Sequence, residues 1–186
     1  MIEDKTFESI DYTKEKLTDN EYDNCTFIDC TFSEHSISNL AFRECEFNEC
    51  NFSNALLKNT VLNDIQFKQC KLLGLDFSVC NSLLLSMNFS ECNLSFASFY
   101  NLKLKETTFS SCNLQEVDFT ETDLTNAIFD NCDLKRAIFE NSILEKADFR
   151  TATNYTIDPV INKMKKARFS ALGLLGLLRN YNLIID

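Results

Sequence analysis

The sequence is poor in residues that punctuate or break secondary structure, with three Gly, one Pro and no Trp among 186 residues. A fold built from hairpins needs more Gly and Pro in its turns, so these numbers argue against such a fold. Histidine is also nearly missing. Because His35 is alone, no Ser/His/Asp or Cys/His arrangement can be assembled, and there is no glycine-rich phosphate loop. We therefore expect no catalytic residues, no cofactor and no enzyme activity.

Long hydrophobic runs are missing as well. The longest one, Ala171 to Leu178, has eight residues including two glycines, which is too short to span a membrane. The first ten residues, MIEDKTFESI, are acidic and lack the charged and then apolar pattern of a secretion signal. We expect a cytoplasmic protein without membrane contact, whose nine cysteines stay reduced.

The net charge of −10 is unevenly distributed. Residues 1–150 contain 26 acidic and 13 basic residues, a net −13, whereas residues 151–186 contain two and five, a net +3. Nucleic acids bind basic surfaces, so the acidic part of the chain disfavours direct binding of DNA or RNA.

A five-residue repeat dominates the chain. Residues 25–59 read CTFID CTFSE HSISN LAFRE CEFNE CNFSN ALLKN, with a large apolar residue at the centre of each pentad and a small residue or cysteine two places before it. A period of five fits neither a helix nor an ordinary strand. It fits a square coil in which each pentad forms one side, so that four pentads close one turn.

The columns of residues at a period of twenty support this interpretation. One column of central residues consists only of phenylalanine: Phe7, Phe27, Phe47, Phe67, Phe89, Phe109, Phe129 and Phe149. Stacked coils predict this, because equivalent side chains lie ~4.8 Å apart and pack on their own kind. The column steps by 22 once, between Phe67 and Phe89, which indicates a two-residue insertion within residues 80–87. We expect a local bulge there, with Leu84 as the central, inward residue.

Six cysteines form a second column at the small inward position: Cys30, Cys50, Cys70, Cys92, Cys112 and Cys132. A straight ladder of thiols does not converge on a metal ion, so we expect no metal site. Disulfides between adjacent coils are sterically conceivable, but a reducing compartment disfavours them. The simplest interpretation is that cysteine acts here as a small apolar filler.

These pentads closely resemble the pentapeptide-repeat family, whose consensus is A(D/N)LXX, over roughly residues 5–150. The resemblance implies an all-β solenoid, a right-handed quadrilateral β-helix of about seven coils. The remaining residues, 151–186, are expected to form a cap with a short α-helix over Ala171 to Asn180, for which Ser170 is a plausible N-cap.

The C-terminal segment carries more apolar residues than a short helix can bury, which favours a two-fold interface with a second copy of the chain. Sealing of the last coil accounts for part of them. The residues expected at this homodimer interface are Leu172, Leu174, Leu175, Leu177, Leu178, Leu183 and Ile184. A basic cluster precedes them, Lys163, Lys165, Lys166 and Arg168, and is expected to be a solvated face or to pair with the acidic coils.

The outward carboxylates are the best candidates for partner binding. Seven coils span ~34 Å, so a net −13 gives ~0.4 charge per Å, within a factor of two of duplex DNA at one charge per ~1.7 Å. In a dimer joined at the C-termini, one acidic segment flanks the centre. Its carboxylates are Glu116, Asp118, Glu121, Asp123, Asp130, Asp133, Glu140, Glu145 and Asp148.

The resemblance also implies a function. The quinolone-resistance members, the Qnr group and its mycobacterial counterpart, are dimers that act on DNA gyrase and topoisomerase IV by resembling DNA. The segments NYTIDP, NKMKKARFS and GLLGLL look like the C-terminal part of Gram-positive Qnr-like chains. Many Gram-negative members have projecting loops that gyrase protection needs, and the sequence indicates none here. The charge per length, the C-terminal segments and the coil nevertheless lead us to expect a DNA mimic that binds a topoisomerase. The alternative is a scaffold solenoid that binds another protein.

Overall fold

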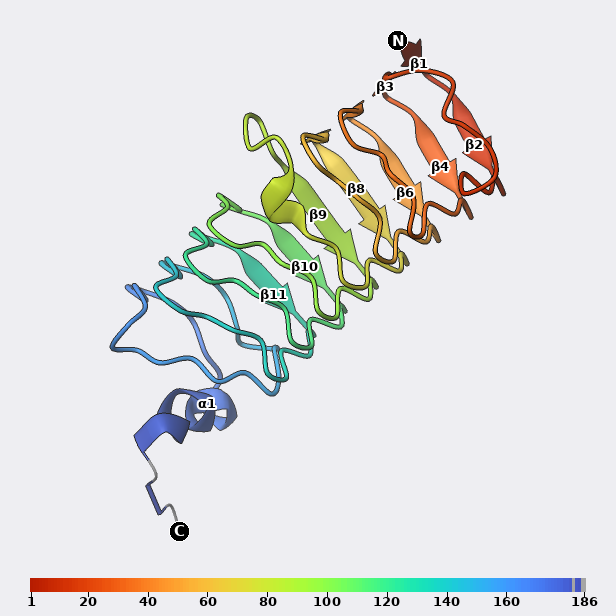
Figure 1. Ribbon diagram of the computed structural model, residues 1–186. Helices are drawn as coiled ribbons and strands as arrows, with labels where there is room; N and C mark the ends of the chain where they lie inside the picture. The colour runs from red at the N-terminus through yellow and green to blue at the C-terminus, as the bar shows by residue number, and fades with distance from the viewer. Residues whose placement is uncertain (182, 185–186) are drawn as a thin grey trace.

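Each pentad forms one side of a square coil, and the coils stack into a rod from the N-terminus to a short C-terminal helix (Figure 1). The computed structural model describes residues 1–181 and 183–184. The predicted right-handed quadrilateral β-helix is confirmed. We name the four sides by their pentads: the first, second, third and fourth sides hold the stacks that contain Phe27, Phe32, Ile37 and Phe42. No helix in the described part of the chain is long and apolar enough to cross a membrane.

Two sides form regular parallel sheets. The first side carries a seven-stranded sheet in the order β11-β10-β9-β8-β6-β4-β2, and the fourth side a four-stranded sheet in the order β1-β3-β5-β7. The first sheet consists of β2 (Thr6–Glu8), β4 (Thr26–Ile28), β6 (Glu46–Asn48), β8 (Ile65–Lys68), β9 (Met87–Ser90), β10 (Thr108–Ser110) and β11 (Ile128–Asp130). The second consists of β1 (Ile2–Glu3), β3 (Glu21–Asp23), β5 (Ala41–Arg43) and β7 (Val61–Asn63). Single parallel bridges, such as Asn93 to Asn113, join the coils elsewhere.

The corners of the coil explain the polar residues that end each pentad. The last residue of a pentad has a left-handed backbone, as at Asn24 (φ 47°), Asp29 (φ 50°) and Asn39 (φ 63°). Asn and Asp tolerate this conformation better than other residues that carry a Cβ. The chain can therefore turn at every corner while containing only three glycines.

The interior of the rod is a ladder of stacked rings. Along the first side, successive Phe rings from Phe7 to Phe149 lie 4.6 to 5.4 Å apart and nearly parallel. Rings on neighbouring sides meet edge-to-face, as Phe109 and Phe119 do at 5.9 Å and 80°. All the phenylalanines of this column are buried except Phe7, which is half-buried in the open first coil. Each such aromatic pair adds about 0.5–1.5 kcal/mol beyond its buried area.

The small inward residues also complete the hydrogen bonding of the coil. The Sγ atoms of Cys50 and Cys70 donate to the carbonyl oxygens of Phe27 and Phe47, 3.4 and 3.2 Å away. The Thr60 hydroxyl donates in the same way to the carbonyl oxygen of Ile37, at 2.9 Å. The cysteines therefore do more than fill space, because they satisfy carbonyl groups that face the interior at the corners.

The insertion lies between Asn81 and Ser86. The Asn81 N–H still donates to the carbonyl of Thr60, whereas β8 and β9 pair Ile65 with Met87, a step of 22. The expectation for Leu84 is wrong: its side chain is 70% exposed, its φ is 62°, and Leu85 packs against the core instead. Leu84 has adopted the left-handed conformation of a corner residue, which turns its side chain outward.

The inserted residues project from the rod beside β9 (Figure 1), so the expectation that no loop projects is also wrong. Before this loop, a single 3-10 turn, η1 (Phe77–Val79), replaces the ordinary turn that ends the third side in neighbouring coils. The Phe67 and Phe89 rings remain stacked at 5.4 Å across the insertion, so the loop interrupts one corner and leaves the core continuous.

The coil continues beyond the expected boundary at residue 150. Lys163 and Arg168 form parallel bridges with Ile143 and Asp148, and the Phe169 ring stacks on Phe149 at 5.2 Å. One more coil therefore precedes the cap. The cap consists of η2 (Leu172–Leu174), α1 (Leu175–Leu178) and η3 (Arg179–Tyr181). Ser170 Oγ accepts a hydrogen bond from the Gly173 N–H at 3.1 Å, which begins the helical segment.

Candidate partner-binding surfaces

Many of the outward Asp and Asn side chains stabilise the coil itself. The Asp118 carboxylate accepts a hydrogen bond from the Thr120 N–H at 2.9 Å, and Asp133 accepts one from the Lys135 N–H at 3.1 Å. Asn93 and Asn113 make the same contact with the N–H two residues later. This local bond favours the turn of each side. It explains why Asp and Asn recur before the central residue of a pentad.

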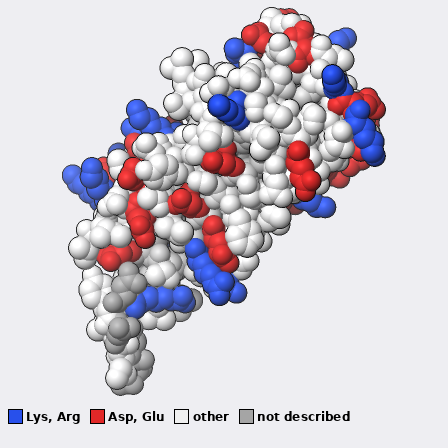
Figure 2. Space-filling view, in the orientation of Figure 1, with Lys and Arg blue, Asp and Glu red and all other residues white. Residues whose placement is uncertain are grey.

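The nine carboxylates predicted to bind a partner do not form one face. The register of the coils places Asp130 and Asp148 on the first side and Asp123 and Glu145 on the fourth. Two more lie on the second side, Glu116 and Asp133, and three on the third, Asp118, Glu121 and Glu140. Figure 2 shows the same mixture, with acidic side chains separated by neutral and basic ones on the visible face.

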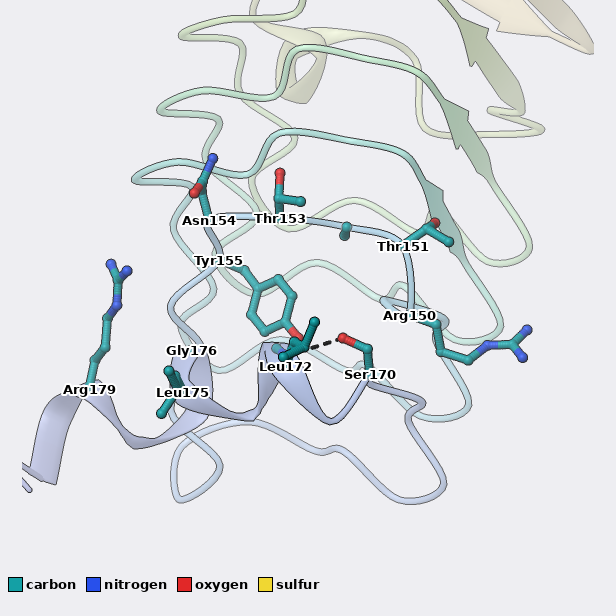
Figure 3. A pocket seen from close by; sticks show the side chains of 12 residues that line it. Arg150, Thr151, Thr153, Asn154, Tyr155, Ser170, Leu172, Leu175, Gly176 and Arg179 are labelled. Carbon is teal, nitrogen blue, oxygen red and sulfur yellow. Dashed lines mark hydrogen bonds between the residues drawn. The ribbon is translucent and has the colours of Figure 1, made fainter. Parts of the chain in front are cut away.

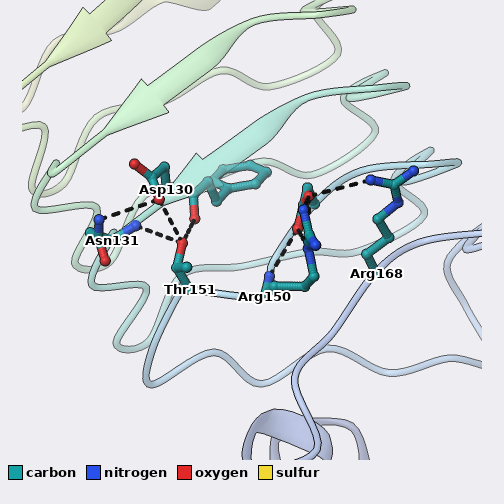
Figure 4. A network of polar contacts seen from close by, with 7 residues as sticks. Asp130, Asn131, Arg150, Thr151 and Arg168 are labelled. Atoms are coloured by element: carbon teal, nitrogen blue, oxygen red, sulfur yellow. Dashed lines mark hydrogen bonds and ion pairs between the residues drawn. The ribbon is translucent and has the colours of Figure 1, made fainter.

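Ion pairs neutralise several of these carboxylates. Arg150 holds Asp148 in a two-pronged contact, with Nη2–Oδ2 at 2.7 Å and Nε–Oδ1 at 3.0 Å, and Arg168 lies 3.9 Å away (Figure 4). These arginines hold the pKa of Asp148 below its usual value. Arg136 pairs with Glu116 at 3.2 Å and Lys105 with Asp123 at 3.3 Å, and the Thr151 hydroxyl donates to Asp130 at 2.9 Å. These carboxylates therefore contribute less negative potential to the surface than their number suggests.

Among the described residues, the third side carries an acidic group without ion pairs. Asp118, Glu121 and Glu140 occupy two consecutive coils on this side, and no ion pair joins them to a base within the described chain. Tyr100 lies on the same side one coil earlier, and the charge of Glu121 raises its pKa. The structure thus brings together three of the nine predicted acidic residues as one surface, which we call the acidic side.

The apolar residues of the cap are largely exposed, as a free interface would require. Leu172 is 91% exposed and Ile184 92%, and Leu174, Leu175, Leu178 and Leu183 are also exposed, whereas Leu177 packs partly against the core. A pocket of about 500 Å³ lies where the helix meets the last coil, and Tyr155 is among its lining residues (Figure 3). The Tyr155 ring is buried, and its hydroxyl has no hydrogen-bond partner among the described residues.

The cysteines are all free thiols and all buried. Within residues 1–181 and 183–184, no group of three His, Cys, Asp or Glu side chains is arranged to hold a metal ion. Desolvation raises the pKa of Cys45 to about 11 and that of Cys80 to about 12. Thiols of this kind are protonated at neutral pH and poor nucleophiles.

Comparison with known families gives two matches. Residues 36–74 match the family described as Pentapeptide repeats (8 copies), and residues 77–149 match the Pentapeptide repeat region. Together they cover more than half of the chain. The chain belongs to the pentapeptide-repeat family. A comparison with curated proteins gives no match.

Three solved structures are similar to this chain, and the one with a TM-score above 0.5 shares the fold. A trypsin-treated variant of QnrB1, a plasmid-mediated fluoroquinolone resistance protein, has a TM-score of 0.58 at 16% identity over 99% of both chains. Full-length QnrB1 gives 0.44 at 17% identity, over 97% of this chain and 99% of the other. HetL from the cyanobacterium Nostoc, involved in heterocyst differentiation regulation, gives 0.42 at 16% identity, over 90% and 86%. At these identities the likeness shows the fold alone.

Sequence reasoning missed an apolar surface in the middle of this pentapeptide-repeat protein. Leu56, Val79 and Tyr100 are exposed on the third side, and Phe96 is 59% exposed at the neighbouring corner with a left-handed φ of 62°. A groove of about 580 Å³ runs past Leu56 and Val79. The columns could have predicted that Phe96 is exposed. The equivalent residues of the neighbouring coils are Gly74 and Glu116, which are typical of an outward corner position and not of the core.

Proposed function

We propose that this protein is a DNA mimic that binds a type II topoisomerase, DNA gyrase or topoisomerase IV, in the cytoplasm and modulates its activity or its sensitivity to fluoroquinolones. The observation that carries the proposal is the excess of outward carboxylates on a straight, narrow rod, a net −13 over residues 1–150. This charge per length is within a factor of two of that of duplex DNA. A groove that binds DNA would attract such a rod.

The acidic side is the surface we assign to the partner. Its Asp118, Glu121 and Glu140 carry no ion pair within the described chain, unlike Asp123 and Asp148. Unpaired carboxylates attract a basic groove more strongly than carboxylates already neutralised within the protein. The local ion pairs reduce the effective charge of the other three sides.

We further propose that the protein is a homodimer joined through its caps. The exposed leucines of the cap, with Leu172 the most exposed at 91%, would leave a contiguous apolar surface in water if the chain were a monomer. A two-fold interface buries the same patch on both copies. It also doubles the length of the acidic rod.

The experiment is a supercoiling assay with purified gyrase and topoisomerase IV from the host, with and without a fluoroquinolone. We expect inhibition of supercoiling, or rescue from the drug, at micromolar protein. A variant with Glu121→Gln and Glu140→Gln should be weaker, whereas Glu3→Gln with Glu8→Gln, at the far end of the rod, should act like the natural chain. Asp118 is left intact because it stabilises its turn. No effect of the natural protein on either enzyme would refute the proposal.

A second candidate function is a scaffold that binds another protein through the apolar surface. The exposed Phe96, held in a strained backbone conformation, favours it, since strain of this kind collects at functional sites. Substitution of Phe96 and Leu56 by Ser separates the two functions. The change should leave topoisomerase inhibition intact if the acidic side acts alone, and should abolish retention of the partner if the protein is a scaffold.

A further inference from the structure

Five basic residues gather at one corner of the last two coils. The lysine patch comprises Lys146, Lys163, Lys165, Lys166 and Arg168, all of them exposed. Lys146 and Lys166 occupy equivalent corner positions on successive coils, and Lys163 and Lys165 lie on the fourth side beside them. These charges lie next to the cap, on a protein whose net charge is −10.

The backbone beneath the patch is held firmly. The Leu144 N–H donates to the carbonyl oxygen of Lys163 at 2.7 Å, and the Lys146 N–H donates to that of Lys165 at 3.0 Å. The Lys163 N–H in turn donates to the carbonyl oxygen of Ser142 at 3.0 Å. The lysines therefore project from a rigid surface, and little backbone order has to be gained when a partner binds.

The charges of the patch are not compensated within the protein. In the part of the chain that the structure describes, no ion pair joins any of the four lysines to a carboxylate. Arg168 lies 3.9 Å from Asp148, whose carboxylate is already held by Arg150 at 2.7 Å. The expected pairing of these residues with the acidic coils is thus limited to Arg168.

The corner is also hollowed. A cavity of about 350 Å³ lies between equivalent residues of three successive coils, and its lining consists of Asn126, Ile128, Lys146, Asp148, Lys166 and Arg168. Two lysines and an arginine line this space, and the one carboxylate among them, Asp148, is already paired with Arg150 at 2.7 Å. Such a hollow suits a carboxylate side chain inserted from outside, which could contact two cations at once.

We infer that the lysine patch docks a carboxylate-rich surface of a protein partner. Along the axis of the rod, the patch covers only two neighbouring coils, which are ~5 Å apart. A DNA duplex, with one charge per ~1.7 Å, would extend from it over Glu145 and Asp123 on the same side and be repelled. A compact acidic surface of a protein can cover the patch without reaching Asp123. Glu145, next to Lys146, lies within the patch and is outnumbered there by five cations. A bound DNA mimic would then present acidic coils and a basic corner to different parts of its partner.

A lipid surface suits the patch less well. Basic residues alone attach a protein weakly, and stable attachment takes a second, apolar element. The exposed apolar side chains nearest to the patch are Ile128, at the hollow, and Val160 and Ile161, before Lys163. They lie outside any helix, so they do not form the apolar face of a membrane-binding helix. The apolar residues of the cap are the ones we assign to the dimer.

The test measures binding of fluorescein-labelled decaglutamate by anisotropy, at low and at physiological salt, with the full-length chain. We expect binding that weakens as salt rises, and a loss of at least about tenfold in Lys163→Glu/Lys165→Glu/Lys166→Glu, because like charges then face the probe. The matched control is Lys5→Glu/Lys16→Glu/Lys58→Glu, which changes the net charge equally at exposed lysines without ion pairs. It should lose much less affinity. Melting curves verify that both variants fold.

Two further probes decide between the classes of partner. A duplex of about 20 base pairs and phosphatidylserine vesicles are titrated in the same way. Stronger binding of either one than of decaglutamate, or equal loss in the patch variant and the control, overturns the inference. The outcome is independent of the topoisomerase assay, because a chain that binds decaglutamate through the patch but leaves gyrase unaffected refutes only the proposed function.

Discussion

The thiol of Cys70 donates a hydrogen bond to the carbonyl oxygen of Phe47, 3.2 Å away and one coil earlier. The hydroxyls of Thr122 and Ser142 make the same bond to the carbonyl oxygens of Phe99 and Phe119, at 2.8 and 2.9 Å. Cysteine, threonine and serine are therefore interchangeable at this position because each supplies one donor in little space.

This equivalence predicts a difference between two small substitutions. Cys70→Ala should lower the free energy of unfolding by about 1–2 kcal/mol, because the Phe47 carbonyl loses its donor in the interior. Cys70→Ser should lose less, since its hydroxyl keeps the donor. Urea denaturation of both variants measures the difference. An alanine variant as stable as the serine variant would show that the thiol acts only as a filler.

The buried thiols also predict a loss of stability in alkali. Their folded pKa values, about 11 for Cys45 and about 12 for Cys80, lie above the ordinary value of 9.0. The folded state thus keeps protons that the unfolded state releases. Stability should be complete below pH 9 and fall by about 1.4 kcal/mol per pH unit for each thiol as the pH rises toward these values.

Urea denaturation between pH 7 and pH 10.5, with reductant present, measures this slope. The variant Cys45→Ser/Cys80→Ser lacks both ionisable groups and should show a shallower decline. If both proteins decline equally, the thiols are not the groups responsible.

Gly176 allows the cap to lie against the coil. A Cβ added there would stand 2.5 Å from the carbonyl oxygen of Tyr155 and 2.6 Å from its ring. Gly176→Ala should therefore lift the helix from the last coil while leaving the coils folded. Limited trypsin digestion should cleave at Arg168 and Arg179 faster than in the natural chain. The exposed substitution Ala171→Ser is the control and should leave the cleavage rate unchanged.

If the protein is a dimer through its caps, charged residues placed in that interface should halve the mass of the particle in solution. Leu172→Asp/Leu175→Asp places two carboxylates in the apolar surface of the cap and should convert a particle of twice the chain mass into one of 21.4 kDa. Light scattering measures both. Leu83→Asp/Leu84→Asp alters equally exposed leucines of the projecting loop and should remain dimeric. A natural chain that scatters as a monomer at high concentration contradicts the dimer.

Phe96 predicts a stabilising substitution. Its left-handed backbone, with φ 62°, is unfavourable for a bulky residue, and its exposed ring gains little from burial. Phe96→Asn should raise the free energy of unfolding by about 1 kcal/mol, since Asn tolerates this conformation. Tyr100→Asn removes an exposed aromatic residue that has no positive φ and should not stabilise. Equal effects of the two changes would reject strain as the cause.

Much of the fold is a direct consequence of the repeat. The column from Phe7 to Phe149 predicts four pentads per coil, because hydrogen bonds between coils keep equivalent residues in register and stack each ring on its own kind. The step of 22 between Phe67 and Phe89 also predicts the inserted residues. The same columns also determine how the acidic residues are distributed over the four sides. A net charge summed over consecutive residues does not show this distribution.

The tertiary structure decided what the period could not. Leu84 and Leu85 are equally apolar, and only the corner conformation of Leu84 determines which one faces the core. The coil past residue 150 was implicit in the sequence, because Phe169 follows Phe149 by twenty residues and stacks on it, and Met164 packs against the core. The sequence by itself determined the periodic core, since stacking is local and repetitive. The ion pair of Arg150 with Asp148 and the contact of Gly176 with Tyr155 join residues outside that period, so only the folded chain reveals them.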